Sequence, residues 1–353
     1  MKNRRIYGVF RGFPGLGRVV AGVSLMEQLR DKYGFEIRLK SYLQGNLYLE
    51  SRGYHIENTI EPRDLCSIGI VPTHKLGVQI LREIKEFCPD AVIIDGEPLV
   101  LQSIKILFPK IKVIALLNPS DVDNPSNDME SMAFFCHYYG LADLSIIHGL
   151  QIISPTSSRM ISIPTILRHE ILNISNYPKS KVYCILGGGT VNVGKDFESN
   201  TIQIGRLCIE AAKILNHLDF TVLCASENVA HQLNKVSTPN NVTIQSAIKD
   251  AVEYYEDASV IITRSGRNSL SELAFLGVPA ISFVCGDAFR REEQKRNIEN
   301  LHIDSILCGD QNMSPIELSN LIQKLSNLKH NSNSFSPGNE MAISKIISFF
   351  ESI

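Results

Sequence analysis

Residues Ile261–Val284 read IITRSGRNSLSELAFLGVPAISFV: an apolar strand, a polar turn, a helix and a second apolar strand. Gly266 lets the backbone approach a ligand closely, and Ser265 is a residue type that caps helices well. The first turn of such a helix offers unpaired N–H groups and the positive end of the helix dipole to an anion such as a diphosphate. The stretch therefore predicts an α/β unit with an anion site at the start of its helix.

Three polar residues share one side of this helix, because Asn268 and Glu272 are four positions apart and Ser269 lies three before Glu272. A carboxylate beyond a phosphate site can bridge vicinal hydroxyls, as on a ribose. The alternative is a capped surface helix with an exposed Glu272, since anion sites at helix starts are common and weakly diagnostic.

The alternation of apolar strands and amphipathic helices extends outward from this stretch over both halves of the chain. The predicted strands are Arg5–Phe10, Phe35–Lys40, Ala91–Ile94, Lys112–Leu117, Lys181–Leu186, Phe220–Ala225, Val242–Gln245, Ser259–Thr263 and Ala280–Val284. The predicted helices are Val19–Lys32, Lys75–Phe87, Leu99–Leu107, Asp128–Tyr139, Thr201–Leu215, Lys249–Tyr255, Arg267–Leu276 and Met341–Phe350. This pattern is typical of doubly wound parallel sheets.

The alternation occurs twice, which predicts two Rossmann-like domains facing a central cleft. We expect an N-terminal domain over 1–163, a linker over 164–180 where prolines break the pattern, and a C-terminal domain over 181–330. A final helix over 339–353 is expected to pack back toward the N-terminal domain.

Composition excludes several classes of function. The 353 residues are 44% hydrophobic and 20% charged with a net charge of -2, which does not favour nucleic-acid binding. No apolar run approaches the length of a membrane span. The eight cysteines include no C-x-x-C pair and no Cys/His cluster with zinc-ligand spacing, so we expect a reduced, cytoplasmic protein with no metal and no cofactor.

The region Ala247–Val284 resembles the donor-site region of family 28 glycosyltransferases, the MurG-like UDP-sugar transferases of the GT-B fold. The resemblance rests on Ile248-Lys249-Asp250, Arg264-Ser265-Gly266, Ser271-Glu272-Leu273 and Gly277-Val278-Pro279-Ala280, in that order. It implies that Ile248 contacts the base through its backbone and that Glu272 holds the ribose. By the same resemblance Ser265, Gly266 and Ser269 lie beside the diphosphate, and Arg264 and Asn268 are expected to belong to the same donor site.

Further segments are similar to the same family. Glu293, Gln294 and Asn297 match residues that touch the donor sugar, with Glu293 standing where the family has an amide. The other matches are Gly188-Gly189-Thr190 after a strand, Arg168 in the linker, and Gly15 and Gly17 after the first strand. Without the resemblance they would be a charged surface helix, a flexible turn, a surface arginine and an ordinary loop.

The catalytic base is harder to assign, because Arg18 stands where many relatives carry a histidine. Inverting transfer needs a group that takes the acceptor proton. Asp95 and Glu97 follow an apolar strand, where open α/β sheets place their sites, so Asp95 is the first candidate and Glu97 the second. The alternative is that Asp95 caps the next helix. Of the histidines, His137 and His148 merit a test, although a structural role is the simpler interpretation.

The resemblance implies an inverting glycosyltransferase that moves a sugar from a nucleoside diphosphate, UDP by preference, to an unidentified acceptor. Two alternatives stay open: a UDP-sugar hydrolase of the pseudaminic-acid-pathway type and a non-catalytic nucleotide-sugar-binding partner. The aromatic segment Phe134–Tyr139 fits a core helix, an acceptor surface or a peripheral membrane contact equally well.

Overall fold

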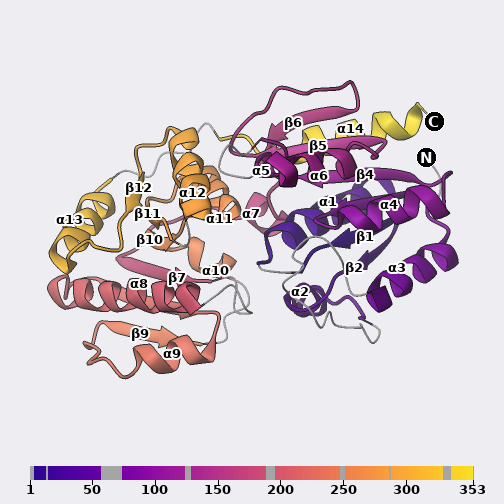
Figure 1. Ribbon diagram of the computed structural model, residues 1–353. Coiled ribbons are helices and arrows are strands. Elements are labelled where there is room, and N and C mark those ends of the chain that lie inside the picture. The colour runs from indigo at the N-terminus through magenta and orange to yellow at the C-terminus, as the bar shows by residue number, and fades with distance from the viewer. Residues whose placement is uncertain are drawn as a thin grey trace. The chain divides into compact units, whose positions relative to one another are not determined.

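The computed structural model describes residues 4–12, 15–56, 74–123, 129–187, 195–246, 251–285, 288–328 and 335–352 (Figure 1). The chain divides into two compact units. Unit 1 comprises Met1–His169 with Pro337–Ile353, and unit 2 comprises Glu170–Ser336. The chain therefore passes from unit 1 into unit 2 and returns for its last helix.

Within the described residues, unit 1 contains a six-stranded parallel sheet with the order β2-β1-β3-β4-β5-β6. Its strands are β1 (Arg5–Phe10), β2 (Glu36–Lys40), β3 (Ala91–Asp95), β4 (Lys112–Leu117), β5 (Leu144–Gly149) and β6 (Met160–Pro164). The central strands β3 and β5 are buried along their whole length, as expected for a parallel sheet with helices on both faces.

Unit 1 has helices on both faces of this sheet. They are α1 (Gly17–Tyr33), α2 (Gln44–Ser51), α3 (His74–Phe87), α4 (Pro98–Leu107), α5 (Pro119–Val122), α6 (Met129–Tyr139) and α14 (Asn339–Glu351). Helices α1 and α14 share one core with alternate residues of the strands, among them Ile6, Ile93 and Ile114. Since neighbouring strand residues point to opposite faces, Tyr7, Val92 and the other intervening residues face α3 and α4.

The last helix belongs to unit 1, as Figure 1 shows by its yellow ribbon among the early elements. Phe350 is 1% exposed, and its ring centroid lies 5.4 Å from that of Phe35. At the other end of α14, the amide of Asn339 pairs with both main-chain groups of Leu167: Oδ1 accepts from its N–H at 2.9 Å, and Nδ2 donates to its carbonyl at 2.8 Å. The segment that leaves unit 1 and the segment that returns to it are thus hydrogen-bonded to each other within unit 1.

Unit 2 repeats the architecture, with a six-stranded parallel sheet ordered β12-β11-β10-β7-β8-β9 among the described residues. Its strands are β7 (Lys181–Leu186), β8 (Asp219–Cys224), β9 (Val242–Gln245), β10 (Ala258–Arg264), β11 (Ala280–Phe283) and β12 (Ile306–Gly309). The strands β10 and β7 pair in parallel, with Thr263 beside Ile185 and a shift of register between Ala258 and Val260.

The helices of unit 2 are α7 (His169–Asn173), which begins at the last residue of unit 1, α8 (Lys195–Ile214), α9 (Glu227–Leu233), α10 (Val252–Tyr255), α11 (Arg267–Leu276), α12 (Ala288–Leu301) and α13 (Pro315–Ser326). Helices α8 and α13 pack on one face, where Cys208 and Ile322 join the strands in a single apolar core. Cys184, Cys208 and Cys224 lie in this core as free thiols, which fits the role of small apolar residues.

These two units confirm the predicted α/β fold of two Rossmann-like domains. Each predicted strand is present to within about two residues at either end. Strands β5, β6 and β12 and helices α2, α5, α7, α9 and α13 are not among the predicted elements. The change of unit falls between His169 and Glu170, inside the segment 164–180 that the sequence indicates as a linker.

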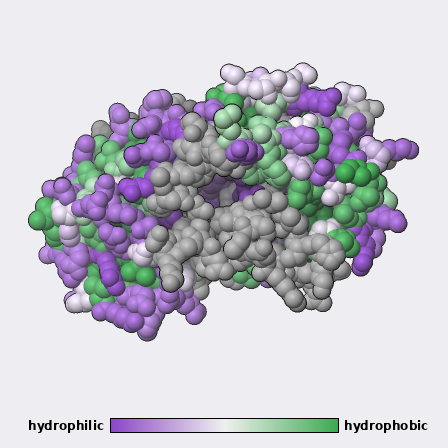
Figure 2. All heavy atoms as spheres, viewed as in Figure 1, coloured by the Kyte–Doolittle hydropathy of each residue, from purple (hydrophilic) through white to green (hydrophobic). Residues whose placement is uncertain are grey.

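Surface properties follow the fold. Figure 2 shows mainly polar surface, with apolar surface on the α4 side of unit 1, where Ile106 and Leu107 are 69% and 57% exposed. On α6, Phe134 and Tyr138 are half-buried, and their ring centroids are 4.4 Å apart. Over the described ranges, no helix is both long and apolar enough to cross a membrane.

The packing of α14 predicts which unit is destabilised when a buried side chain of this helix is removed. Phe350→Ala should lower the free energy of unfolding of unit 1 by about 3 kcal/mol, because a buried phenyl ring is replaced by a cavity. Hydrogen exchange resolved by peptide should show faster exchange in β1 and α1 and unchanged exchange in unit 2. Met341→Ala, on the same helix at a position 53% exposed, is the control and should have little effect. Faster exchange confined to unit 2 would contradict the assignment of α14.

Candidate functional site

The strand order of unit 2 creates a ligand-binding position. After β7 the chain adds β8 and β9 on one side, then returns to add β10, β11 and β12 on the other. The carboxyl ends of β7 and β10 therefore form the switch point of the sheet, the place where open α/β sheets bind ligands. Leu186 ends β7 and Arg264 ends β10, so the turn Arg264–Gly266 lies at this point (Figure 1).

This turn has a defined geometry. Ser265 is 2% exposed; its N–H donates to the Phe283 carbonyl at 3.0 Å, and its hydroxyl bonds to that of Ser282 at 2.8 Å. The N-cap of α11 is Gly266, so the expectation that Ser265 caps the helix is wrong: its hydroxyl is committed to the sheet. An exposed glycine at the N-cap leaves the first N–H groups of α11 without a covering side chain from that residue.

Helix α11 buries its carboxylate. Glu272 is 2% exposed, which contradicts the alternative of a surface helix with an exposed glutamate. Asn268 and Ser269, in the first turn, are half-buried. A buried carboxylate is costly unless several donors satisfy it, and it can accept about four hydrogen bonds. Glu272 therefore lies within the packed side of α11.

Helix α12 carries the three residues matched to the donor sugar. Gln294 reaches back to the end of β11, where its Oε1 accepts from the Cys285 N–H at 2.7 Å and its Nε2 donates to the Cys285 carbonyl at 2.9 Å. Glu293 and Asn297 are half-buried and one helical turn apart. Gln294 therefore anchors α12 to the residues that follow β11.

Several predicted residues lie elsewhere. Gly188, Gly189, Thr190 and Ile248 fall outside the described residues, whereas exposed Gly187 directly follows β7. Arg168 is a half-buried residue at the end of unit 1, and Gly15 and Gly17 precede and begin α1.

Unit 1 has a switch point of its own between β1 and β3, where Phe10 pairs with Asp95. Arg11 follows β1, and its Nε donates to the Gly96 carbonyl at 2.9 Å. Gly96 has a φ of 91°, and a Cβ there would lie 2.8 Å from two atoms of the Arg11 side chain and 3.0 Å from Arg18. Only glycine lets both arginines approach the chain between Asp95 and Glu97.

Asp95 is held in an ion pair. It is completely buried and accepts a hydrogen bond from Arg18, which also donates to both oxygens of Asp121 at 2.9 and 3.0 Å. Burial opposes ionisation of Asp95, but Arg18 and His148 together outweigh it and lower the pKa of Asp95 to about 2. A carboxylate with so low a pKa is a weak proton acceptor, so Asp95 suits the catalytic role less well than the sequence suggests.

His148 supports this ion pair from β5. It is completely buried; its Nδ1 accepts from the Ile166 N–H at 3.3 Å, and its Nε2 lies 3.9 Å from Asp95 Oδ2. A ring nitrogen that accepts a hydrogen bond carries no proton, so the proton of the neutral ring is on Nε2 and faces Asp95. Its burial and its contacts favour a structural interpretation of His148. His137 is exposed on α6.

Glu97 has a different environment. It is 1% exposed, and its Oε1 accepts from the Tyr42 hydroxyl at 2.5 Å and lies 4.0 Å from Arg11 Nε. Burial raises the pKa of Glu97, and Arg11 and Tyr42 only partly offset it. The same edge of the sheet thus holds one strongly acidic carboxyl group and one with an elevated pKa, an arrangement typical of acid–base sites.

Three residues of this cluster were not found from the sequence: Arg11, Tyr42 and Asp121. Arg11 follows the first strand directly, which is a usable signal. Asp121 lies in the capping box of α5 with Asn118, so it resembles an ordinary helix start. Tyr42 offers no pattern, because its contact with Glu97 joins residues 55 positions apart.

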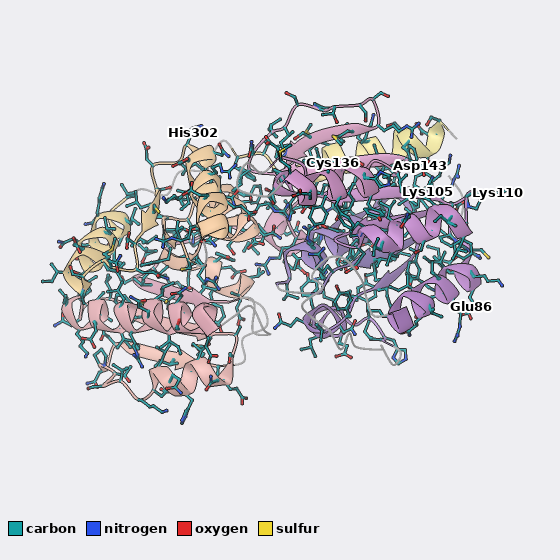
Figure 3. All side chains as sticks on the ribbon, viewed as in Figure 1. Glu86, Lys105, Lys110, Cys136, Asp143 and His302 are labelled. Carbon is teal, nitrogen blue, oxygen red and sulfur yellow. The ribbon has the colours of Figure 1, made fainter. Side chains whose placement is uncertain are left out.

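At the amino ends of the unit 1 strands, an ion pair has a structural role. Figure 3 shows Lys105 and Asp143 side by side; Lys105 Nζ donates to Asp143 Oδ2 at 2.9 Å. The same oxygen accepts from the Val113 N–H at 2.8 Å, which fixes the starts of β4 and β5. Among the residues with described positions, no group of three or more His, Cys, Asp or Glu side chains is arranged to hold a metal ion.

The ion pair predicts how stability depends on pH. Asp95→Asn should lower the free energy of unfolding by about 3 kcal/mol at about pH 7, because Arg18 loses a buried partner. The pKa of Asp95 is about 2 in the fold and about 4 in an unfolded chain, so the native carboxylate stabilises above about pH 4 and this contribution is lost as the pH falls toward 2. The difference between wild type and variant should narrow on acidification.

Urea unfolding across this pH range measures the effect. Asp31→Asn is the control, because its ion pair with Arg30 is exposed and contributes at most about 1 kcal/mol. A constant difference between wild type and Asp95→Asn at all pH values would contradict the ion-pair assignment.

Two sequence comparisons gave matches. Residues 203–352 match the model of the glycosyltransferase family 28 C-terminal domain. A 104-residue stretch is 29% identical to the UDP-N-acetylglucosamine--N-acetylmuramyl-(pentapeptide) pyrophosphoryl-undecaprenol N-acetylglucosamine transferase of Latilactobacillus sakei. That stretch spans 28% of this chain and 28% of the relative.

Solved structures extend the likeness over both units. Acinetobacter baumannii MurG matches with a TM-score of 0.60 at 16% identity, over 99% of this chain and 100% of that one. The UDP-GlcNAc 2-epimerase of Neisseria meningitidis, bound to UDP-GlcNAc, matches with a TM-score of 0.63 at 13% identity, over 98% and 100%. At these identities the likeness establishes the fold, which MurG and the epimerase share.

The family match contains Ala258–Val284 and the switch point of unit 2, and it confirms the resemblance that these residues indicated. It also continues into α14, although that helix packs in unit 1. Residues 203–352 are thus similar to the glycosyltransferase family 28 C-terminal domain, and the two units have the GT-B fold that the MurG structure also has.

Proposed function

We propose that the protein is an inverting glycosyltransferase that moves a sugar from a UDP-sugar to an acceptor hydroxyl. The observation that carries the proposal is the family 28 segment at the switch point of unit 2, where Arg264, Ser265 and Gly266 precede α11 and Glu272 is buried within it. The named relative in Latilactobacillus sakei is itself an N-acetylglucosamine transferase, and the meningococcal structure holds UDP-GlcNAc.

The diphosphate would bind at the start of α11. The exposed N-cap Gly266 lets an anion reach the first N–H groups of the helix, and the helix dipole favours negative charge there. Arg264, Asn268 and Ser269 surround this start. Such fixed dipoles and charges stabilise the diphosphate as it leaves, without reorganisation during the reaction. Gly188, Gly189, Thr190, Arg168, Gly15 and Gly17 remain further proposed contacts.

Glu272 would bind the ribose, and Ile248 the base. A carboxylate accepts hydrogen bonds from two vicinal hydroxyls at once, and burial strengthens such bonds by lowering the local dielectric constant. Glu293 and Asn297 would contact the donor sugar, with Gln294 holding their helix in place. Glu293, as a carboxylate, can only accept hydrogen bonds, which favours hydroxyl or amide donors on the sugar.

Nucleotide binding tests the donor site. UDP should raise the melting temperature of the wild-type protein, since a ligand of the folded state stabilises it. Glu272→Gln should reduce this rise by at least half. The amide has only one accepting oxygen, whereas the carboxylate can accept one ribose hydroxyl on each of its two oxygens. Glu210→Gln is the matched control: Glu210 is a surface residue of α8 paired with Lys213 at 2.6 Å, and its variant should respond to UDP as wild type does. No rise with UDP at millimolar concentration would contradict the proposal.

Glu97 is the proposed base that takes the proton of the acceptor. A base works best when its pKa lies near the working pH, and burial moves the pKa of Glu97 upward while that of Asp95 is about 2. Asp95 would instead hold Arg18, which occupies the position of the relatives' histidine.

Turnover tests this assignment. Glu97→Gln should lower the release of UDP from UDP-GlcNAc, assayed with candidate acceptors, by at least about 100-fold, with the UDP-induced rise in melting temperature retained. Glu83→Gln removes a carboxylate that also accepts from a tyrosine hydroxyl at 2.5 Å, on α3, and should retain turnover. Wild-type turnover by Glu97→Gln would contradict the role of Glu97. Equal UDP release with water alone would favour the hydrolase.

A further inference from the structure

Tyr42 makes the shortest described contact to Glu97. Its hydroxyl donates to Glu97 Oε1 at 2.5 Å, with Tyr42 8% and Glu97 1% exposed. A hydrogen bond to an ionised group is shorter and stronger than one between neutral groups. The bond therefore favours the ionised carboxylate and fixes the direction in which Oε1 points.

The loop that carries Tyr42 packs tightly against the loop after β1. Ser41 Oγ donates to the Phe10 carbonyl at 2.7 Å. A Cβ on Gly12 would lie 1.8 Å from the Tyr42 carbonyl oxygen, and one on Gly45 would lie 1.9 Å from Ser41 Oγ. Glycine at both positions lets the two loops meet backbone to backbone, which restricts the movement of Tyr42.

The backbone next to Tyr42 is strained. Leu43 has φ 51° and ψ -126°, a conformation that a branched side chain rarely adopts. The neighbouring main chain holds it there, since the Gly45 N–H donates to the Tyr42 carbonyl and the Asn46 N–H to that of Leu43, both at 3.1 Å. Strain of this kind persists where the surroundings enforce it, and it concentrates at functional sites.

The groups facing Glu97 come from four segments. Arg11 follows β1, Tyr42 follows β2, Arg18 lies on α1, and Asp95 ends β3. Burial raises the pKa of Glu97 most; Arg11, Tyr42 and Arg18 lower it, and Asp95 raises it. Tyr42 is the neutral donor among them, so its hydroxyl can be removed without changing the charge of the cluster.

We propose that Tyr42 is a positioning residue that keeps Glu97 ionised and its Oε1 oriented for proton transfer. The role in catalysis rests on the proposed function, in which Glu97 is the base. The strained loop at Leu43 and the contact with Gly12 maintain the position of the Tyr42 hydroxyl.

The carboxyl titration of Glu97 tests the proposal without any assay of activity. In protein with ¹³C-labelled glutamate, the Glu97 carboxyl signal is identified by its loss in Glu97→Gln. Tyr42→Phe should move its titration upward by about one pH unit, since a hydrogen bond to the ionised form is lost. Tyr7→Phe is the matched control: it removes a partly buried 2.5 Å hydrogen bond from a tyrosine to Glu83 and should leave the titration of Glu97 unchanged.

A second variant covers the case in which Tyr42→Phe does not fold. Glycine adopts the Leu43 conformation without strain, so Leu43→Gly should fold with a melting temperature at or above that of wild type. It should move the Glu97 titration in the same direction by a smaller amount, because the loop is less restricted. An unchanged Glu97 titration in the folded variants would overturn the proposal.

The activity profile separates the two proposals. With UDP-GlcNAc as donor, the acid limb of kcat/KM should move upward in Tyr42→Phe by as much as the titration, and KM for the donor should not change. If UDP-GlcNAc is not turned over at all, the proposed function fails while the titration still decides the effect of Tyr42 on Glu97. If the titration moves and the acid limb does not, the catalytic part of the proposal is overturned.

Discussion

In both units, the side on which the chain adds strands reverses once, between β1 and β3 in unit 1 and between β7 and β10 in unit 2. At each reversal the loops after two neighbouring strands leave in opposite directions, so the carboxyl ends of those strands are not covered by a crossover. The strands bury mainly apolar residues along their lengths, and the charged and glycine residues of the candidate sites lie at or just beyond their ends. Asp95, Glu97, Arg264 and Gly266 all occupy such positions.

The polar groups at the two switch points come from different parts of the chain. In unit 2 the main chain supplies the polarity: a helix start, a glycine N-cap and a buried hydroxyl pair leave room for an anionic ligand. In unit 1, side chains supply it, and the positive charges of Arg11 and Arg18 are matched by nearby carboxylates. The first arrangement is suited to hold a diphosphate, and the second to adjust the proton affinity of a carboxyl group.

The sequence predicts the fold well where burial makes strands continuous and apolar. It misses β5 because Ser145 and His148 interrupt the apolar run, and β6 because that strand is only 5 residues long and ends at a proline. His148 is tolerated in a buried strand since the Ile166 N–H satisfies its Nδ1, a contact that no local pattern reveals.

The candidate site divides in the same way. Helix α11 and its glycine can be predicted from the sequence because they are contiguous. The N-cap is Gly266, however, and not the predicted Ser265. The opposite pKa shifts of Asp95 and Glu97 cannot be predicted from the sequence, because both are acidic residues at the end of the same strand. Their contacts with Arg18 and Tyr42, from distant parts of the chain, set them apart.

Because α14 returns to unit 1, that unit is formed by two separate segments of the chain. The N-terminal unit is encoded in two pieces, and a gene cut after His169 omits the helix that covers its core. The end of α14 lies beside the start of β1, where Arg4 donates to the Phe350 carbonyl at 3.4 Å. A circular permutation that joins these ends by a short loop, starting at Pro337 and finishing at His169, would encode unit 1 as one continuous polypeptide.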